Sequence, residues 1–422
     1  MGNNRHFPGP DTIFRTVLSN GIVVLIYENF SADSFVFEGS LPAGALVNPR
    51  SQAGLADFLA EMLLRGTRYD TFETIYDRLE AVGASVGFSS GYHFTEFSGS
   101  GLVEDLDLVL RQAADALRAP TLPEDHIARV RGETLTALQM RANDTRRMAG
   151  LRFRETLYQG HPYGISADGY PESIAALTAD DLRQFHDTYF GPRGLILTLV
   201  GAIPRAEGLA RLEAIFGDWQ APGQQAQPPA PPAARPVGTV RTQVVMPGKS
   251  QADIVLGLPG PLRSAPDFQA ARLANVILGV FGMMGRLGKS VREEQGLAYY
   301  AHSSLASSVG PSPWSVNTGV SPAKVEQAIA SIRAEIRRMQ EERVSQEELS
   351  DSQAYLTGSL PVGLETNDGL ASIIGDMEVY NLGLDYLQRY ANEINAVTPE
   401  QVQAAAQKYF SADDVVIAVA GP

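Results

Sequence analysis

Two carboxylates four residues apart are the first side chains of this sequence whose types and spacing could do chemistry. Asp57 and Glu61 lie in segment 54–67, which reads Gly-Leu-Ala-Asp-Phe-Leu-Ala-Glu-Met-Leu-Leu-Arg-Gly-Thr. Residues four apart on a helix share one face, so both carboxylates could point toward the same ion. A catalytic zinc, however, needs about three protein ligands, commonly His and carboxylate, and an open position for water.

The remaining donors of the chain do not complete such a site. Two carboxylates alone make at best a weak, exchangeable site for a hard cation. No two histidines are close enough in sequence to form a local ligand pair; they are His6, His93, His126, His161, His186 and His302. We therefore favour a solvated acidic helix face over an unorthodox metal site, and we expect neither a metal nor another cofactor in this chain.

The same segment resembles the zinc helix of the inverzincin metallopeptidases, the family of pitrilysin, insulysin and the mitochondrial processing peptidase, which carries H-x-x-E-H. By this resemblance, Asp57 and Glu61 stand at the two His positions, and Ala60 stands at the position of the general-base Glu. The family's third zinc ligand, a Glu further along the chain, corresponds to Ala137. All four functional positions are replaced, which implies a metallopeptidase-like chain that does not hold the metal itself.

A second segment keeps residues that the resemblance makes functional. Residues 285–300 read Gly-Arg-Leu-Gly-Lys-Ser-Val-Arg-Glu-Glu-Gln-Gly-Leu-Ala-Tyr-Tyr and resemble the family's R-E-x-x-G-L-A-Y. Arg292 and Tyr299 correspond to an Arg that anchors the substrate backbone and a Tyr that donates to the scissile carbonyl as it becomes an oxyanion. Removing one such donor typically costs about 2.7–4 kcal/mol of transition-state stabilisation.

Arg292 and Tyr299 also have an ordinary structural interpretation. Arg292 could pair with Glu293 or Glu294 at the end of a helix, and Tyr299 could belong to the strand that follows. The glycine-rich stretch 279–285 just before them lacks the strand and the Lys-Ser/Thr ending of a Walker loop, so no phosphate site is expected there.

One more replacement bears on peptide binding. In the family, an Asn-Ala pair after the zinc helix lies on an edge strand to which substrate peptides add as an extra strand. In this sequence Gly87 and Phe88 occupy those positions. Glycine weakens a strand, and the Phe ring is expected to crowd an incoming backbone. Peptide binding by the first half is therefore doubtful.

An internal repeat with a period of 220 residues divides the chain. Segment 174–202 aligns without gaps on segment 394–422, with identities that include Thr178 and Thr398. Each copy predicts a helix with a Thr N-cap, followed by an apolar strand that ends at Gly. We expect a degenerate metallopeptidase-like half, a Pro/Ala/Gln-rich linker and a second half with Arg292 and Tyr299; their bounds are 1–221, 222–239 and 240–422.

Apolar strands open each half and amphipathic helices follow them. Segments 22–27, 242–246 and 254–258 predict strands, and 325–340 has the apolar stripe of a helix. The irregular succession of strands and helices predicts an α+β fold with a mixed sheet covered by helices in each half. The resemblance, which runs nearly end to end, implies that the two halves face each other across a cavity.

Charge and composition restrict the partners. A net charge of −14 argues against nucleic acid and anionic membrane surfaces and is better suited to a basic peptide or a basic partner surface. The absence of cysteine excludes disulfides and thiolate metal sites. Residues 1–8 contain no signal-peptide core, and the longest apolar runs are too short to span a bilayer. We expect a cytoplasmic protein.

The resemblance then predicts a division of labour between two chains. In some members of the family one chain carries the zinc motif and its partner completes the site. We expect this chain to be inactive alone and to form a heterodimer with a homologous zinc-bearing subunit, which supplies zinc, its ligands and the base. Together they would hydrolyse short unfolded peptides, with Arg292 and Tyr299 acting in trans. The alternatives are an inert scaffold or peptide-holding protein, and a homodimer with a rebuilt site.

Overall fold

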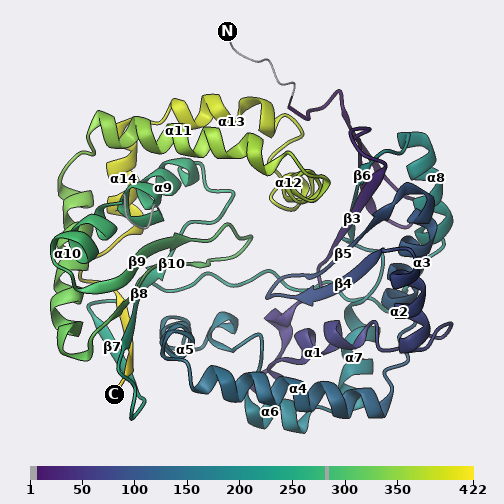
Figure 1. Ribbon diagram of the computed structural model, residues 1–422, viewed down its shortest axis with the longest axis horizontal. Coiled ribbons are helices and arrows are strands. Elements are labelled where there is room, and N and C mark those ends of the chain that lie inside the picture. Colours follow the sequence, from purple (N-terminus) through teal and green to yellow (C-terminus); the bar gives the residue numbers. More distant parts are fainter. Residues whose placement is uncertain (1–6, 281–284) are drawn as a thin grey trace. The chain divides into compact units, whose positions relative to one another are not determined.

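The computed structural model describes residues 7–280 and 285–422, which form two compact units (Figure 1). Residues 1–6 and four residues of the glycine-rich stretch 279–285 lie outside this description. Unit 1 comprises residues up to 136 together with 166–228 and 361–389, and unit 2 comprises 137–165, 229–360 and 390–422. Each unit therefore contains a segment from the other half of the sequence.

Unit 1 is built on a six-stranded mixed sheet with the order β1-β2-β6-β3-β5-β4. Only β2 and β6 run parallel; every other neighbouring pair is antiparallel. The strands are β1 (Ile13–Val17), β2 (Val23–Glu28), β3 (Ser34–Leu41), β4 (Ser85–Ser90), β5 (Thr95–Leu102) and β6 (Ile196–Gly201). Strand β4 is an edge strand, as the resemblance predicts for the segment that contains Gly87.

The two faces of this sheet differ because side chains alternate along each strand. Phe37 on β3 packs against Phe97 and Phe216 on the apolar face, at ring distances of 5.7 and 5.9 Å. The helices of this face are α1 (Leu55–Met62), α2 (Phe72–Ala81), α3 (Leu106–Arg118), α7 (Ala179–Tyr189) and α8 (Arg205–Phe216). The opposite face carries Glu38, and α12 (Asn367–Val379) covers its β6 and β3 part (Figure 1).

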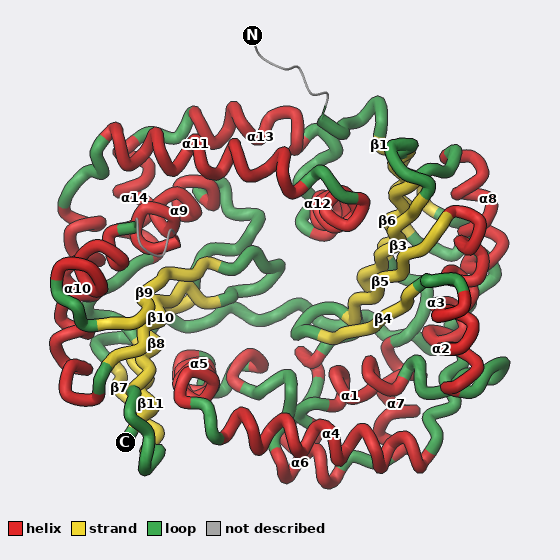
Figure 2. Tube along the Cα trace, viewed as in Figure 1, coloured by secondary structure: helices red, strands yellow, loops and turns green. Residues whose placement is uncertain are grey.

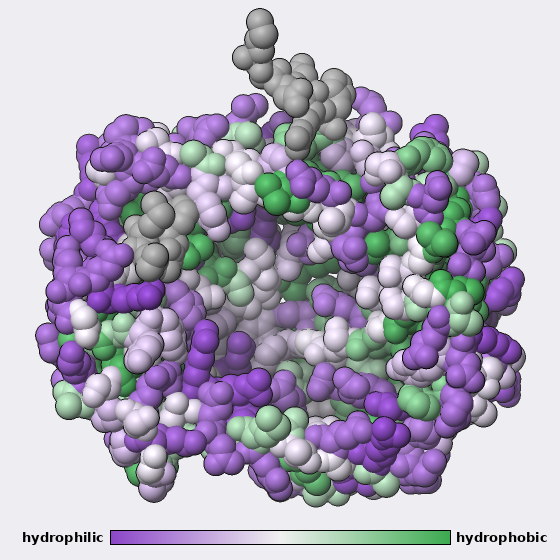
Figure 3. Space-filling view, viewed as in Figure 1, coloured by the Kyte–Doolittle hydropathy of each residue, from purple (hydrophilic) through white to green (hydrophobic). Residues whose placement is uncertain are grey.

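Unit 2 repeats this plan with five strands in the order β7-β11-β8-β10-β9. The strands are β7 (Val240–Val245), β8 (Ala252–Pro259), β9 (Ala298–Leu305), β10 (Pro313–Val320) and β11 (Val416–Gly421). Helix α5 (Thr145–Leu157) packs on β11, β8 and β7, and Figure 2 shows it across the sheet from α9 (Phe268–Asn275), α10 (Val325–Glu341) and α14 (Pro399–Tyr409). Hydrophilic residues dominate the visible surface over α10 (Figure 3).

Four further α-helices are described: α4 (Glu124–Ala142), α6 (Pro171–Ala176), α11 (Gln346–Gly363) and α13 (Tyr386–Asn395). None of the helices in the described part of the chain is long and apolar enough to cross a membrane. The segment 221–239 contains no helix or strand. Its Gln224 side chain is buried, and its amide oxygen accepts a hydrogen bond of 3.0 Å from the backbone N–H of Arg193.

The 220-residue repeat is visible in the structure itself. Helices α7 and α14, and strands β6 and β11, begin and end at positions that differ by 220. Thr178 and Thr398 each accept a hydrogen bond from the third residue of the helix, whose side chain accepts one in return from the Thr N–H. The predicted fold class, α+β with a helix-covered mixed sheet in each of two halves, is confirmed.

Candidate functional site

Helix α1 holds the residues at the former zinc positions. It begins after Gly54, whose backbone is left-handed with φ = 90°, and a Cβ there would lie 2.6 Å from the Ile174 side chain. The apolar side of α1 is buried against the sheet, so Asp57 and Glu61 share the opposite side. Glu61 is exposed and Asp57 is half-buried.

Burial raises the pKa of Asp57 to about 7, and the nearby carboxylates of Asp168 and Glu61 add to this shift. Near neutral pH, Asp57 is therefore protonated in a large fraction of molecules. The interpretation of this surface as a solvated acidic face is right for Glu61 and wrong for Asp57, because the apolar packing of α1 withdraws Asp57 from water.

The donor set on α1 does not fit a catalytic zinc. In the part of the chain that the structure describes, no three His, Cys, Asp or Glu side chains are grouped so that they could hold a metal ion. Ala60 is buried, and Ala137 on α4 offers only a methyl group. Two carboxylates, one of them holding a proton for much of the time, lack both the third ligand and the base.

Arg292 and Tyr299 lie in unit 2, on the two sides of a tight turn. Arg292 belongs to the π-helical turn η6 (Gly288–Glu294), and the N–H of Gly296 donates a 3.1 Å hydrogen bond to its carbonyl oxygen. Gly296 has φ = 55°, which lets the chain reverse into β9. Arg292 is exposed, and its side chain forms no ion pair with Glu293 or Glu294 among the described residues.

Tyr299 is the extra residue of a bulge in β9, the edge strand of its sheet. Its neighbours Ala298 and Tyr300 pair with Val320 and Gly319, which are consecutive residues of β10. Bulges re-aim side chains and occur often beside active sites. Tyr299 is 84% exposed, the most exposed tyrosine among the described residues, so its hydroxyl is available to a partner or a substrate.

Sequence comparison finds two family models that match the chain. Residues 36–168 match the sequence model described as insulinase (peptidase family M16), and residues 176–356 match the model described as the peptidase M16 inactive domain. The chain belongs to peptidase family M16. The resemblance to the inverzincin peptidases is thereby confirmed.

Some relatives of this chain are named as proteases, and one is named as a non-peptidase homolog. An uncharacterized zinc protease of Streptomyces coelicolor is 27% identical over 94% of this chain and 87% of its own length. A non-peptidase homolog of Helicobacter pylori is 22% identical over 89% of this chain and 86% of its own. A solved structure, the peptidase M16 inactive domain from Pseudomonas fluorescens, superposes with a TM-score of 0.91 at 26% identity, over 97% of this chain and 98% of that one.

In this M16 chain, a buried carboxylate holds Tyr300, the residue that follows the bulged Tyr299, and sequence reasoning did not find it. Asp253 on β8 is 1% exposed and accepts hydrogen bonds from the hydroxyls of Tyr300 and Thr145, the latter at 2.5 Å. Gly319 lies between Asp253 and Tyr300 in the sheet register, so the Tyr300 ring passes over it. The sequence signal was a lone Asp inside the apolar run Ala-Asp-Ile-Val-Leu-Gly-Leu.

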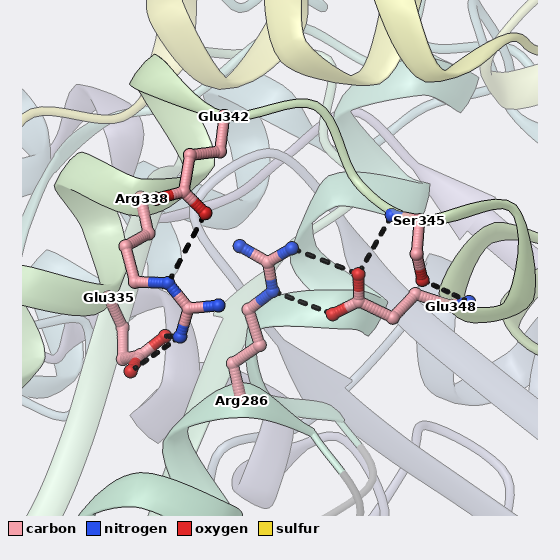
Figure 4. Close-up of polar contacts among 6 residues, drawn as sticks. All are labelled: Arg286, Glu335, Arg338, Glu342, Ser345 and Glu348. Atoms are coloured by element: carbon pink, nitrogen blue, oxygen red, sulfur yellow. Dashed lines mark hydrogen bonds and ion pairs between the residues drawn. The ribbon is translucent and has the colours of Figure 1, made fainter.

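A second anchor fixes the segment that leads to Arg292 (Figure 4). The buried Arg286 guanidinium donates two hydrogen bonds, of 2.7 and 3.0 Å, to the carboxylate of Glu348 on α11. These bonds, together with one from the N–H of Ser345, lower the pKa of Glu348 to about 2. Arg286 is therefore held in place six residues before Arg292.

The edge strand β4 of unit 1 differs from the sequence prediction in one respect. Phe88 pairs with Phe97 of β5 in the register, and the two rings lie 5.5 Å apart. Phe97 is buried on the apolar face, so the Phe88 ring lies on that face and not beside the free edge. The expectation that Phe88 crowds an incoming backbone is wrong, because side chains of a strand point above and below the sheet.

Proposed function

We propose that this chain is the non-catalytic subunit of a heterodimeric zinc peptidase, in which Arg292 and Tyr299 complete in trans the site of a homologous partner that carries H-x-x-E-H. The partner supplies the metal, its ligands and the base, and the substrates are short unfolded peptides. We further propose that the heterodimer works in the cytoplasm, which cell fractionation would test.

The observation that carries this proposal is the exposed Tyr299 on a bulge whose neighbouring residue is locked to a buried carboxylate. A phenol hydroxyl in this position can donate a hydrogen bond to the carbonyl oxygen of a peptide as negative charge develops on it. The Arg292 guanidinium offers several donors to backbone carbonyls of the same peptide. Neither group needs a metal bound to its own chain.

The decisive experiment combines this chain with a homologous chain from the same source that has an intact H-x-x-E-H. Quenched fluorescent peptides should be cleaved by the mixture and by neither chain alone. Tyr299→Phe should lower kcat by about 10²–10³, which is typical for loss of an oxyanion donor, without loss of assembly in size-exclusion chromatography. Tyr69→Phe, at an exposed tyrosine of unit 1, is the matched control and should leave turnover unchanged.

One observation favours a second function. A relative that aligns over most of the chain is called a non-peptidase homolog, which fits an inert scaffold or peptide-holding protein. Under that function, no partner restores cleavage, and Tyr299→Phe changes neither assembly nor peptide binding. A mixture that assembles without peptidase activity would therefore contradict the trans-acting subunit and support the scaffold.

A further inference from the structure

A pocket of about 540 Å³ opens in the helical layer that covers the apolar face of the unit 1 sheet. Helix α3 supplies half of its lining, and the rest comes from α2, the loop before it, the end of α8 and the loop after that. Figure 1 shows these three helices on the same side of the sheet. Helix α12 covers the opposite face, so this pocket is separate from the surface around Glu38.

The pocket carries charges of both signs. Its lining contains three guanidinium groups and three carboxylates, which belong to Arg78, Arg111, Arg118, Asp70, Asp115 and Asp218. These formal charges cancel, so the pocket as a whole favours neither a polyanion, such as a nucleotide, nor a polycation. A ligand that itself carries one charge of each sign is the best match.

Four of the six charged groups are already paired within the protein. The Arg78 guanidinium lies 2.6 Å from the Asp70 carboxylate, and the Arg118 guanidinium lies 2.8 Å from the Asp218 carboxylate. Arg118 also donates a hydrogen bond of 3.0 Å to the carbonyl oxygen of Ile215 at the end of α8. These two pairs hold the walls of the pocket and leave little charge for a ligand to compensate.

The remaining two groups, Arg111 and Asp115, have no such partner. Among the described residues, neither side chain forms a hydrogen bond or an ion pair. They lie one turn apart on α3 in the order Arg then Asp, which is the less favourable orientation for an ion pair along a helix. Burial and the nearby Asp70 carboxylate raise the pKa of Asp115, although the charges of Arg118 and Arg111 act against this shift. A cationic group beside Asp115 and an anionic group beside Arg111 would satisfy both side chains.

A buried amide in the lining is also left without a partner for one of its atoms. Gln112 is 2% exposed, and its Nε2 donates a hydrogen bond of 3.1 Å to the Asp70 carboxylate. An ionised carboxylate only accepts hydrogen bonds, so this contact fixes which end of the amide is the donor. The Oε1 atom of Gln112 has no donor among the described residues. Buried acceptors are rarely left unpaired, so the pocket lacks an N–H or O–H group at this point.

The spacing of Arg111 and Asp115 selects the length of a ligand with one charge of each sign. Four residues of an α-helix rise about 6 Å along its axis. The ammonium nitrogen and the carboxylate carbon of an extended dipeptide are also about 6 Å apart, whereas in a single amino acid they are only about 2.5 Å apart. The apolar side chains of Leu108 and Ile215 line the same pocket and offer contacts to the side chains of a dipeptide.

We propose that this pocket binds a free dipeptide with apolar side chains, whose ammonium group pairs with Asp115 and whose carboxylate pairs with Arg111. Both ends of the dipeptide must be free, because each supplies one of the two charges. The inference goes beyond the proposed function: the site contains neither Arg292 nor Tyr299, and binding needs neither a partner subunit nor a metal. Dipeptides are end products of peptide hydrolysis, so the pocket would sense the products of peptidases.

The test measures binding by isothermal titration calorimetry with the full chain alone. The probe is the dipeptide Ala-Phe, and the comparison ligands are N-acetyl-Ala-Phe, Ala-Phe amide and free phenylalanine. Ala-Phe should bind about tenfold more tightly than each of the others, because the blocked dipeptides lack one charge and phenylalanine is too short to meet both groups. Absence of Ala-Phe binding, or equal binding of Ala-Phe and its amide, would overturn the proposal.

Variants locate the site and assign the two ends of the ligand. Arg111→Gln should weaken Ala-Phe about tenfold and leave Ala-Phe amide unchanged, whereas Asp115→Asn should weaken Ala-Phe about tenfold and leave N-acetyl-Ala-Phe unchanged. Arg183→Gln and Asp187→Asn, at exposed residues of α7 in the same unit, are the matched controls and should change no affinity. An unchanged affinity for Ala-Phe in both pocket variants would refute the site.

Two further measurements separate this proposal from its neighbours. Inorganic phosphate should not displace Ala-Phe, and displacement would contradict the proposal by showing that the arginines form an anion site. Tyr299→Phe should bind Ala-Phe as the unchanged chain does, because the pocket lies within unit 1. Failure of dipeptide binding and failure of trans-acting catalysis are therefore distinguishable.

Discussion

The hydroxyl of Tyr300 donates a hydrogen bond to Asp253, a carboxylate on β8 that is 1% exposed. The two residues lie on either side of Gly319 in the register, so the bond ties the edge strand β9 to the centre of the sheet. Burial and the bond to Asp253 raise the pKa of Tyr300, which keeps it a neutral donor. Tyr299, the next residue, is left to project from the bulge.

Tyr300→Phe should destabilise unit 2 and loosen the bulge. The substitution leaves a buried carboxylate oxygen without one of its donors, which typically costs about 1–3 kcal/mol. Urea unfolding should show this loss, and hydrogen exchange should accelerate in residues 298–301. Tyr69→Phe removes a hydroxyl from an exposed ring and serves as the control. Unchanged exchange in β9 would show that Asp253 does not position Tyr299.

The ion pair between Arg286 and Glu348 predicts a loss of stability in acid. The folded-state pKa of Glu348, about 2, is below its ordinary value of 4.5. The unfolded chain therefore takes up a proton first as the pH falls, and the stabilisation present above about pH 4.5 is lost toward pH 2. Glu348→Gln should cost about 2 kcal/mol at pH 7, discounted for partial exposure, and almost nothing near pH 2.

Denaturant titrations of both proteins across this range would measure the difference. Glu342→Gln is the matched control, because Glu342 is exposed and lies 3.6 Å from Arg338. Surface pairs of this kind contribute about 0–1 kcal/mol. A Glu348→Gln penalty that persisted undiminished at low pH would argue against the ion pair as its origin.

Asp57 predicts the opposite pH dependence. Its folded-state pKa, about 7, lies above the ordinary value of 3.8. Between these values the folded chain holds a proton that the unfolded chain has released, so stability falls as the pH rises to about 7 and then levels. Asp57→Asn should stabilise the protein by about 1 kcal/mol at pH 8, after allowance for partial exposure, and have little effect near pH 4.

The control for Asp57 is Asp77→Asn, at an exposed residue of α2, which should leave stability within about 0.5 kcal/mol at both pH values. Thermal unfolding followed by circular dichroism would suffice. If Asp57→Asn stabilised the chain equally at both pH values, packing and not the charge of Asp57 would be responsible.

The distribution of ligands on α1 predicts the metal content of the purified chain. Asp57 and Glu61 supply carboxylates without imidazole, a third ligand or a base, so zinc should be held weakly and lost on dialysis. Mass spectrometry of the dialysed protein should find far less than one zinc per chain. Tightly bound, stoichiometric zinc that Asp57→Asn removes would instead favour a rebuilt site.

The sequence predicted those features of the fold that depend on only a few neighbouring residues. The N-caps Thr178 and Thr398 and the strands after them recur at the same spacing in the structure because caps and alternation act within a few residues. The exchange of α5 and α12 between the two halves was not predicted. Their apolar stripes show that each helix is buried, but amphipathicity does not specify which sheet a helix packs against.

The sequence likewise predicted some residues of the candidate site and not others. Arg292 and Tyr299 were found through a motif, whereas Asp253 was not, because its role depends on a register that places Gly319 between it and Tyr300. The environment of Glu38 is likewise non-local: β5 and α12 bring three other carboxylates to it. Sequence spacing cannot show a charge cluster that only strand pairing and helix packing assemble.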